Sequence, residues 1–265
     1  MDNKIKSVLR LIRRAGKTIR RADLSDGTIA KKGEDSANLV TVYDKAVQDY
    51  LEGALLRLFP EAVFMAEEQE NDPAVLTAER CFVIDPIDGT ANFVHGLKRS
   101  VISVAMLSRG EVAFAAVYDP YVDELFYAEA GGGAFCNGKR IKVSDRAPVD
   151  SLTVFGTTPY EKENAKRTFA LAEVLFCKTR DVRRSGAAAL DLAYVAAGRC
   201  DMFFEMRLLP WDVAAGLLLI REAGGIVSDA DGEPIMLGGR TPVLAASPTC
   251  HEFLLTEAKH VLEDN

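Results

Sequence analysis

The stretch CFVIDPIDGT, residues 81–90, decides how this chain is interpreted. Its four apolar residues, 81–84, predict a buried strand, and Asp85 and Asp88 follow where that strand enters a turn. A strand end holds two carboxylates rigidly side by side, where they repel each other unless a cation lies between them. Since the chain has only three histidines, the pattern favours an oxygen-liganded ion such as Mg²⁺ over zinc.

Bulk composition limits the classes of protein to which the chain can belong. Its 265 residues, 48% hydrophobic and 27% charged, suit one large soluble domain or two closely packed subdomains. The net charge of −7 opposes nonspecific nucleic-acid binding, and no basic arm or stripe stands out. No apolar run reaches the roughly 20 residues of a membrane span, and the N-terminus lacks the apolar core of a signal peptide. We therefore expect a cytoplasmic protein with no membrane partner and no direct nucleic-acid partner.

The five cysteines are scattered along the chain and never form a CxxC pair. Their odd number and irregular spacing make a disulfide framework and a zinc site equally unexpected. We interpret them as thiols that pack as small hydrophobic groups.

Apolar periodicity divides the chain into two halves. Residues 1–25 predict an amphipathic helix, 26–38 a mobile polar loop, and a second helix runs from Thr41 or Asp44 to Phe59. Strands are predicted at 63–66, 81–84, 100–109, 111–118 and 124–130. From about residue 150, strands at 152–155, 200–204, 226–229 and 243–246 alternate with helices at 161–176, 187–197, 213–223 and 248–261. The pattern predicts an α/β fold with a largely antiparallel N-terminal half (1–148), which carries most candidate ligands, and an α/β C-terminal half (149–265).

Four acidic residues occupy comparable positions in this pattern. Glu67, Asp85 and Asp88 follow predicted strands, and Asp212 stands directly before an apolar helix. Taken alone, Asp212 is more often an N-cap than a ligand, because Asp is common at helix N-caps. Glu67-Glu68 taken alone is more often a solvated charge pair. The occurrence of all four acids at element ends favours a shared cation site.

Two longer motifs resemble those of a known family. DPIDGT at 85–90 and WDVAAG at 211–216 are similar to the two signature motifs of the inositol monophosphatase family, in the same order and separation. Glu67-Glu68 stands where that family carries Gly-Glu-Glu. Further stretches match at residues 38–44, 133–138 and 183–194. The resemblance covers nearly the whole chain and implies the family's layered αβαβα sandwich of the sugar-phosphatase type, together with a homodimer.

The resemblance implies a set of metal ligands. Glu67, Asp85 and the backbone carbonyl of Ile87 would bind a first Mg²⁺, and Asp85, Asp88 and Asp212 would bind a second. A third, weaker ion would share Glu67. The cofactor expected from the resemblance is therefore two to three Mg²⁺ ions.

Catalytic and substrate-binding roles are also implied by the resemblance. Thr90, polarised by Asp44, would orient the attacking water alongside Glu67. Glu205 stands where the family contacts inositol. The full set of implied substrate contacts is Asp88, Gly89, Thr90, Ala188, Glu205 and Asp212.

Together these roles imply hydrolysis of a phosphate monoester by metal-activated water, sensitive to Li⁺. Two metal ions can lower the pKa of water and take up the departing oxygen, so no Ser, Cys or His nucleophile is needed. Inositol monophosphate is the first substrate expected. Fructose 1,6-bisphosphate, 3′-phosphoadenosine 5′-phosphate, NADP and histidinol phosphate are alternatives. The alternative of another class is a regulatory binding partner of the transcription machinery.

The sequence departs from the family's pattern at three places. Ala66 replaces the usual Gly before the acidic pair, and Ala187 stands where a hydroxyl residue is common. Lys98-Arg99 replaces an aromatic-proline pair. The resulting cationic loop would suit either a doubly charged substrate or a solvated surface, and we expect the surface role. His95 is expected to be structural, and His251 and His260 to face solvent from the last helix.

Overall fold

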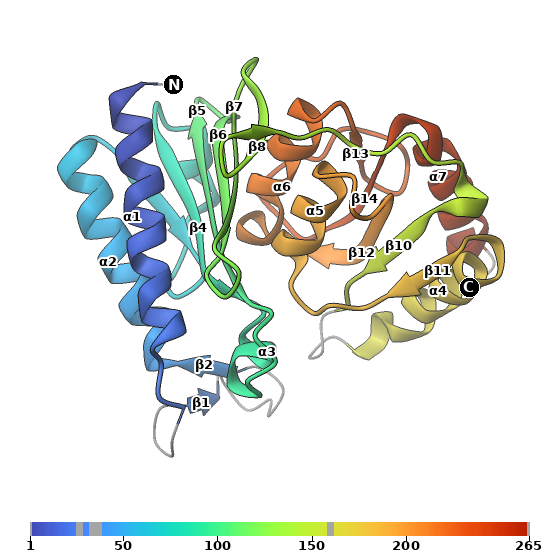
Figure 1. Cartoon of the computed structure of the whole chain (residues 1–265), viewed down its shortest axis with the longest axis horizontal. Coiled ribbons are helices and arrows are strands. Elements are labelled where there is room, and N and C mark those ends of the chain that lie inside the picture. The colour runs from blue at the N-terminus through green and yellow to red at the C-terminus, as the bar shows by residue number, and fades with distance from the viewer. Residues whose placement is uncertain (1, 25–28, 32–38, 158–161, 264–265) are drawn as a thin grey trace.

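The computed structural model describes residues 2–24, 29–31, 39–157 and 162–263, and it arranges them in five layers (Figure 1). Helices α1 and α2 cover one face of a seven-stranded sheet, and α5 and α6 fill the space between that sheet and a five-stranded one. Helices α4 and α7 cover the outer face of the second sheet. The predicted αβαβα sandwich is confirmed.

The outer helices of the first half are α1 (Asn3–Arg20) and α2 (Val42–Leu58). Thr41 is the N-cap of α2 and forms a capping box with Asp44, which fixes where that helix begins. Within the loop predicted over residues 26–38, the structure describes β1 (Ile29–Lys31), which pairs antiparallel with β2 (Leu39–Thr41). The loop prediction is wrong for that strand, and its remaining residues lie outside the described ranges.

The seven-stranded sheet has the order β3-β4-β5-β6-β7-β8-β9. Its strands are β3 (Val63–Ala66), β4 (Cys81–Asp88), β5 (Val101–Ser108), β6 (Glu111–Asp119), β7 (Glu124–Glu129), β8 (Gly133–Cys136) and β9 (Lys139–Arg140). β3 runs parallel to β4, and each later pair is antiparallel. Every residue of β4 is buried, because helices lie on both faces of the sheet. Two short helical segments flank β4, namely the 3₁₀ turn Pro73–Thr77 and α3 (Thr90–Val94).

The five-stranded sheet has the order β11-β10-β12-β14-β13. Its strands are β10 (Leu152–Phe155), β11 (Asp181–Arg183), β12 (Met202–Leu208), β13 (Ile226–Ser228) and β14 (Thr241–Ala246). Both neighbours of β10 run parallel to it, whereas β14 runs antiparallel to β12 and β13. The helices of this half are α4 (Ala165–Lys178), α5 (Ala188–Ala196), α6 (Pro210–Glu222) and α7 (Pro248–Glu263). Short 3₁₀ turns lie at Pro148–Asp150 and Lys162–Asn164.

The largest apolar cluster joins the two sheets through the inner helices. It contains Phe126 of the first sheet, Leu192 of α5, Leu219 of α6 and Phe203 of the second sheet. Separate clusters lie beneath α1 and α2 and beneath α4 and α7. Because α6 contacts both sheets, its first turn is held rigidly between them.

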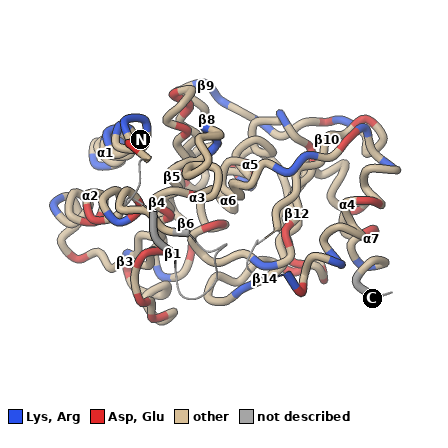
Figure 2. Tube along the Cα trace, turned by 90° about the horizontal axis from the view of Figure 1, so that it is seen from below, with Lys and Arg blue, Asp and Glu red and all other residues tan. Residues whose placement is uncertain are grey.

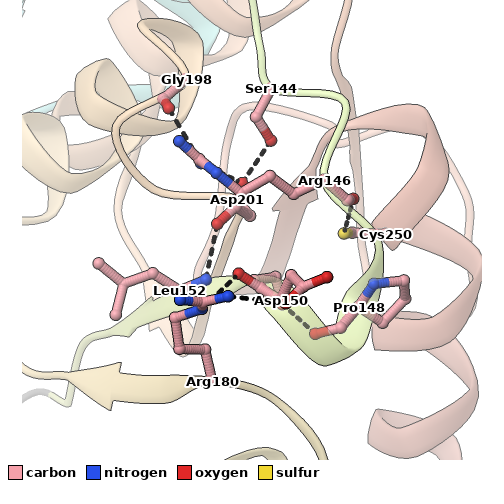
Figure 3. A network of polar contacts seen from close by, with 10 residues as sticks. Ser144, Arg146, Pro148, Asp150, Leu152, Arg180, Gly198, Asp201 and Cys250 are labelled. Atoms are coloured by element: carbon pink, nitrogen blue, oxygen red, sulfur yellow. Dashed lines mark hydrogen bonds and ion pairs between the residues drawn. The ribbon is translucent and has the colours of Figure 1, made fainter.

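The chain passes from the first sheet to the second through residues 141–151, and a buried carboxylate anchors this passage (Figure 3). Asp201 accepts hydrogen bonds from the Ser144 hydroxyl, from Arg146 Nη1 at 2.7 Å and from the Leu152 amide at 2.6 Å. These contacts fix the passage against the turn that precedes β12.

Two further expectations can be compared with the fold. The prediction that His251 faces solvent is wrong: its side chain is buried and lies 2.9 Å from the Ser228 hydroxyl through Nε2. His260 is exposed as predicted. Within the described ranges, none of the helices combines the length and the apolar character that crossing a bilayer requires.

Candidate active site

The candidate site begins at the C-terminal end of β4. Asp85 and Asp88 are buried there, at 2% and 7% exposure. The pairing of β4 with β5 shifts register between these two residues, which is where Pro86 removes a backbone donor. Such an irregularity re-aims side chains at the end of a strand. Asp85 Oδ1 then accepts a hydrogen bond from the Ile87 amide at 3.0 Å.

The predicted acids are brought together around Asp85. Burial raises the pKa of Asp85 well above its ordinary value, and the charges of Glu67, Asp88, Asp212 and Asp44 raise it further. These residues come from the end of β3, the end of β4, the first turn of α6 and the first turn of α2. These strand and helix ends therefore lie close enough for their charges to act on Asp85, as the sequence argument expected.

Asp88 connects this cluster to the second half of the chain. Its Oδ1 and Oδ2 accept hydrogen bonds from the Ala188 and Ala189 amides, at 3.2 and 2.8 Å, in the first turn of α5. Burial raises the pKa of Asp88 to about 7, the charge of Asp191 adds to that rise, and the two amides oppose it. Ala188, expected to contact substrate, thus donates its backbone amide to Asp88.

Asp212 occupies a different helix position from the one expected. α6 begins at Pro210, so Asp212 is the third helical residue, and its Oδ2 accepts the Leu209 amide at 2.7 Å. The prediction that this acid directly precedes the helix as its N-cap is wrong. The prediction began the helix at residue 213. The helix begins three residues earlier because proline suits the first helical position, where its missing N–H costs nothing.

Thr90 and Asp44 form the expected pair. Thr90 Oγ1 donates to the Ile87 carbonyl at 3.1 Å and lies 3.4 Å from Asp44 Oδ1. The other oxygen of Asp44 accepts from the Thr41 amide at 2.8 Å and from the Thr41 hydroxyl at 2.6 Å. The fully buried Asp44 carboxylate therefore supports the Thr90 hydroxyl from the start of α2.

Gly89 is required at the turn between β4 and α3. Its φ is +86°, and an added Cβ would lie 3.0 Å from the Arg99 carbonyl and 3.1 Å from the Ala187 Cβ. Asn92, which the sequence analysis did not single out, closes the same turn. Its Nδ2 donates at 2.8 Å to both the Arg99 and Ser185 carbonyls. Asn92 thus joins the loop after α3 to the loop before α5.

Glu205 lies on β12 at the side of the site formed by the second sheet. Burial raises its pKa well above the ordinary value, the charges of Asp212, Asp88 and Asp191 raise it further, and Arg184 opposes them. A Cβ added to Gly156, at the end of β10, would overlap the Glu205 carboxyl group. The missing side chain at Gly156 is what leaves room for Glu205.

The donor set fits a hard cation. Carboxylates and the Ile87 carbonyl supply only oxygen, as Mg²⁺ prefers, and the buried charges repel one another unless a cation offsets them. In this conformation several of the carboxylates bond to backbone amides. The fit is one of donor chemistry: among the described residues, no group of three or more His, Cys, Asp or Glu side chains lies close enough together in this conformation to hold a metal ion.

Comparison with known proteins agrees with this geometry. The model of the inositol monophosphatase family matches residues 2–263. The chain is 38% identical over 255 residues to an inositol-1-monophosphatase of Rhizobium meliloti, covering 94% of this chain and 92% of the relative. It is 36% identical over 260 residues to the Nus factor SuhB of Pseudomonas aeruginosa, covering 97% and 96%.

The chain belongs to the inositol monophosphatase family.

A solved structure supports the same assignment. The inositol monophosphatase of Thermotoga maritima superposes with a TM-score of 0.88 at 33% identity, covering 99% of each chain. The layered fold described above is therefore the fold of the inositol monophosphatase family.

Asp191 is a carboxylate of the site that the sequence analysis did not single out, although it lies within the matching stretch 183–194. It is buried in α5, and burial raises its pKa to about 7 while Ser185 and the charges of Arg99 and Arg184 oppose the rise. Its charge acts on both Asp88 and Glu205. The available signal was an acid within the otherwise apolar segment AAALDLAYVAA.

Lys98 and Arg99, the departures noted in the sequence, are both exposed. The Arg99 guanidinium lies 6.0 Å from the Tyr194 ring centroid, and its carbonyl accepts from Asn92. The exposure agrees with the expected surface position, but Arg99 also contacts Tyr194 and Asn92, and its charge acts on Asp191.

Proposed function

We propose that this chain is a Mg²⁺-dependent phosphomonoesterase. Family membership supports hydrolysis of a phosphate ester. The observation that carries the metal dependence is the group of acids around the buried Asp85 carboxyl, whose pKa is raised by burial and then by the charges of these neighbours. Glu67, Asp85, Asp88, Asp212 and the Ile87 carbonyl would hold two to three Mg²⁺ ions.

The chain's own groups would position the reactants. Bound Mg²⁺ would neutralise the phosphate oxygens and lower the pKa of the attacking water. The Thr90 hydroxyl, supported by Asp44, would orient that water together with Glu67. The Gly89 and Thr90 amides at the start of α3 would donate to phosphate oxygens. With these roles assigned, hydrolysis would need no covalent intermediate on the protein.

Inositol monophosphate is the substrate we propose first. Glu205 lies beside Asp88 and Asp212, where its carboxyl group would accept or donate hydrogen bonds to an alcohol's hydroxyls. The relative from Rhizobium meliloti is named for this ester. Fructose 1,6-bisphosphate, 3′-phosphoadenosine 5′-phosphate, NADP and histidinol phosphate remain the competing substrates. We further propose a cytoplasmic homodimer that is inhibited by Li⁺.

Phosphate release with Mg²⁺ across these five esters tests the proposal. A preference for inositol 1-phosphate, lost with EDTA and reduced by Li⁺, is the expected result. Preference for another ester would retain the metal mechanism and replace the substrate. Turnover that persists in EDTA would contradict the metal dependence.

A second candidate function is regulation of the transcription machinery by direct protein contact. The observation that favours it is the similarity to relatives named Nus factor SuhB over nearly the whole chain. This function would be favoured over the enzyme if none of the five esters were hydrolysed and the chain specifically captured a purified RNA polymerase or Nus protein. The two functions are compatible, so activity on an ester would not by itself exclude the second.

A further inference from the structure

The first helix carries a concentration of positive charge that the net charge of −7 conceals. From Asn3 to Arg21 every charged residue is basic, and Figure 2 shows this run of Lys and Arg along α1. The basic positions are Lys4, Lys6, Arg10, Arg13, Arg14, Lys17, Arg20 and Arg21. The expectation that no basic stripe stands out is therefore wrong for this helix.

Five of these side chains form one exposed stripe: Lys6, Arg10, Arg14, Lys17 and Arg21. Their spacing of four, four, three and four residues places them on one face of an α-helix. At a rise of about 1.5 Å per residue, the stripe is roughly 22 Å long. Among the described residues, the ion pair recorded for α1 is that of Arg13 with Asp123, at the edge of this face, so the stripe cations are left for an outside partner.

The surroundings of the stripe restrict what that partner can be. The opposite face of α1, including Val8, Ile12 and Ile19, is buried in the apolar cluster beneath the helix. The helix therefore has no free apolar face to place in a bilayer, which interfacial helices need. α2 packs beside α1 and exposes Asp49 in an ion pair with Lys45, at 2.7 Å, so the uninterrupted run of like charge is confined to α1.

We propose that the α1 stripe binds a single-stranded nucleic acid through its phosphate backbone. A flexible strand can follow this narrow line of cations along one face of the helix. α1 itself cannot enter the major groove of a duplex, because its other faces are packed against the sheet and α2. The stripe offers only Lys and Arg, with no aromatic ring for base stacking. Binding should therefore be independent of sequence and steeply dependent on salt.

Fluorescence anisotropy with a labelled 15-nucleotide oligouridylate tests this proposal. EDTA in the buffer would keep the proposed phosphatase inactive. Five phosphate contacts predict that log K falls with log[NaCl] at a slope of about −3.5, since each contact on a single strand contributes about −0.7. The double variant R10E/R14E should lower that slope to about −2 and weaken binding at least tenfold, because two contacts are lost and two repulsions are gained.

A matched control separates the stripe from net charge. K166E/R167E reverses two exposed cations on α4 and changes the net charge by the same amount, so it should bind RNA nearly as the unaltered chain does. R10Q/R14Q serves as a second stripe variant if charge reversal impairs folding, as judged by circular dichroism. The absence of saturable binding at 50 mM NaCl, or equal losses in the α1 and α4 variants, would overturn the proposal. Binding to phosphatidylserine vesicles without binding to RNA would also overturn it.

Discussion

Asp85 is a residue at which burial and neighbouring charges act together against ionisation. Its carboxylate is surrounded by Glu67, Asp88, Asp212 and Asp44, whose charges all disfavour ionisation. Asp85→Asn keeps the shape but removes the charge that we propose binds Mg²⁺. We expect phosphate release to fall about 100-fold or more, as when an electrostatic stabiliser is removed from an active site. In EDTA, the thermal midpoint should hold or rise, because one source of repulsion is gone.

The matched control for this substitution is Glu70→Gln. Glu70 is exposed just beyond the Glu67-Glu68 pair, so the same carboxylate-to-amide change there should leave both measurements unchanged. Near-normal turnover of Asp85→Asn at saturating Mg²⁺ would contradict the proposed ligand role. A lower midpoint in EDTA would contradict the repulsion argument.

Gly156 leaves space for the Glu205 carboxyl group because it has no side chain. An added Cβ would overlap the Glu205 carboxyl group, so Gly156→Ala must displace it. If Glu205 contacts the substrate alcohol as we propose, KM should rise about tenfold, as expected for the loss of a hydrogen bond to a charged group, while kcat falls less. Gly53→Ala is the control, because its Cβ would have only Arg57 Nη1 nearby, at 3.9 Å. Unchanged steady-state kinetics in Gly156→Ala would contradict the substrate contact.

His251 should make stability depend on pH. Burial lowers its pKa from the ordinary 6.5, so below pH 6.5 the unfolded chain binds a proton that the folded chain resists. The stabilisation is therefore complete above pH 6.5 and is lost as the pH falls towards the folded-state pKa, by at most about 1.4 kcal/mol per pH unit. In urea unfolding between pH 5 and 7, His251→Gln should show a shallower rise of stability with pH than the unaltered chain. Parallel curves for the two proteins would contradict this assignment.

At the residue scale, the sequence singled out residues that belong to a motif. Asp85, Asp88 and Asp212 stood out because they lie in two family motifs and at the ends of predicted elements. The burial of His251 depends on Ser228, which is 23 positions away, and no local pattern records that contact. Asn92 was missed for the same reason, since both carbonyls that it joins lie in other loops.

At the scale of elements, α6 is tied to the first sheet by the carboxylate near its C-terminus. Glu222 Oε1 and Oε2 accept from the Gly131 and Gly133 amides, each at 2.6 Å, at the turn between β7 and β8. The glycine run 131–133 is the tight connection between these two paired strands. The acid is unfavourable at a helix C-terminus by itself, so its contribution comes from these two hydrogen bonds.

Glu222→Ala should therefore destabilise the protein. Two charge-assisted hydrogen bonds at a partly exposed site suggest a loss of about 1–2 kcal/mol in the free energy of unfolding. Urea unfolding would measure it, with Glu173→Ala on the exposed side of α4 as the control. If the two variants lose equal stability, the contact between α6 and the turn contributes nothing measurable.

Element boundaries were predicted well where an amphipathic pattern was long and poorly where partners define the element. β5 and β6 agree with the prediction to within one residue at every end, because each is a long run of mostly apolar, buried residues bounded by a turn. The short strands β8, β9 and β11 were not predicted. β9 and β11 contain at most one apolar residue each, so only pairing with a neighbouring strand makes them strands.

At the scale of the whole molecule, the two sheets share one apolar cluster. Phe126 and Phe203 lie in different sheets, yet both belong to the cluster built around α5 and α6. The predicted halves, 1–148 and 149–265, are therefore expected to unfold together even though each contains its own sheet. The layered order was predictable because the family motifs specify it, whereas composition alone would have allowed one domain or two.

Asp201 is where this cooperativity can be tested, because it fastens the passage between the sheets (Figure 3). Its side chain is fully buried, and it accepts from Arg146 and from the Leu152 amide as well as from Ser144. Asp201→Ala leaves the Leu152 amide unpaired, while Arg146, at 46% exposure, can return to water. We therefore expect a loss of about 2–4 kcal/mol, somewhat below that of breaking a fully buried ion pair.

The nearby Asp150–Arg180 pair provides the control, since both side chains are largely exposed and the ion pair spans 2.7 Å. Asp150→Ala should cost less than about 1 kcal/mol. Urea unfolding followed by the fluorescence of Trp211, the single tryptophan, and by far-UV circular dichroism should give coincident transitions in both variants. Trp211 lies in α6 between the sheets. If its fluorescence and the far-UV signal give different transitions, the two halves unfold separately. That result would mean that Asp201, and not the shared apolar cluster, holds the two halves together.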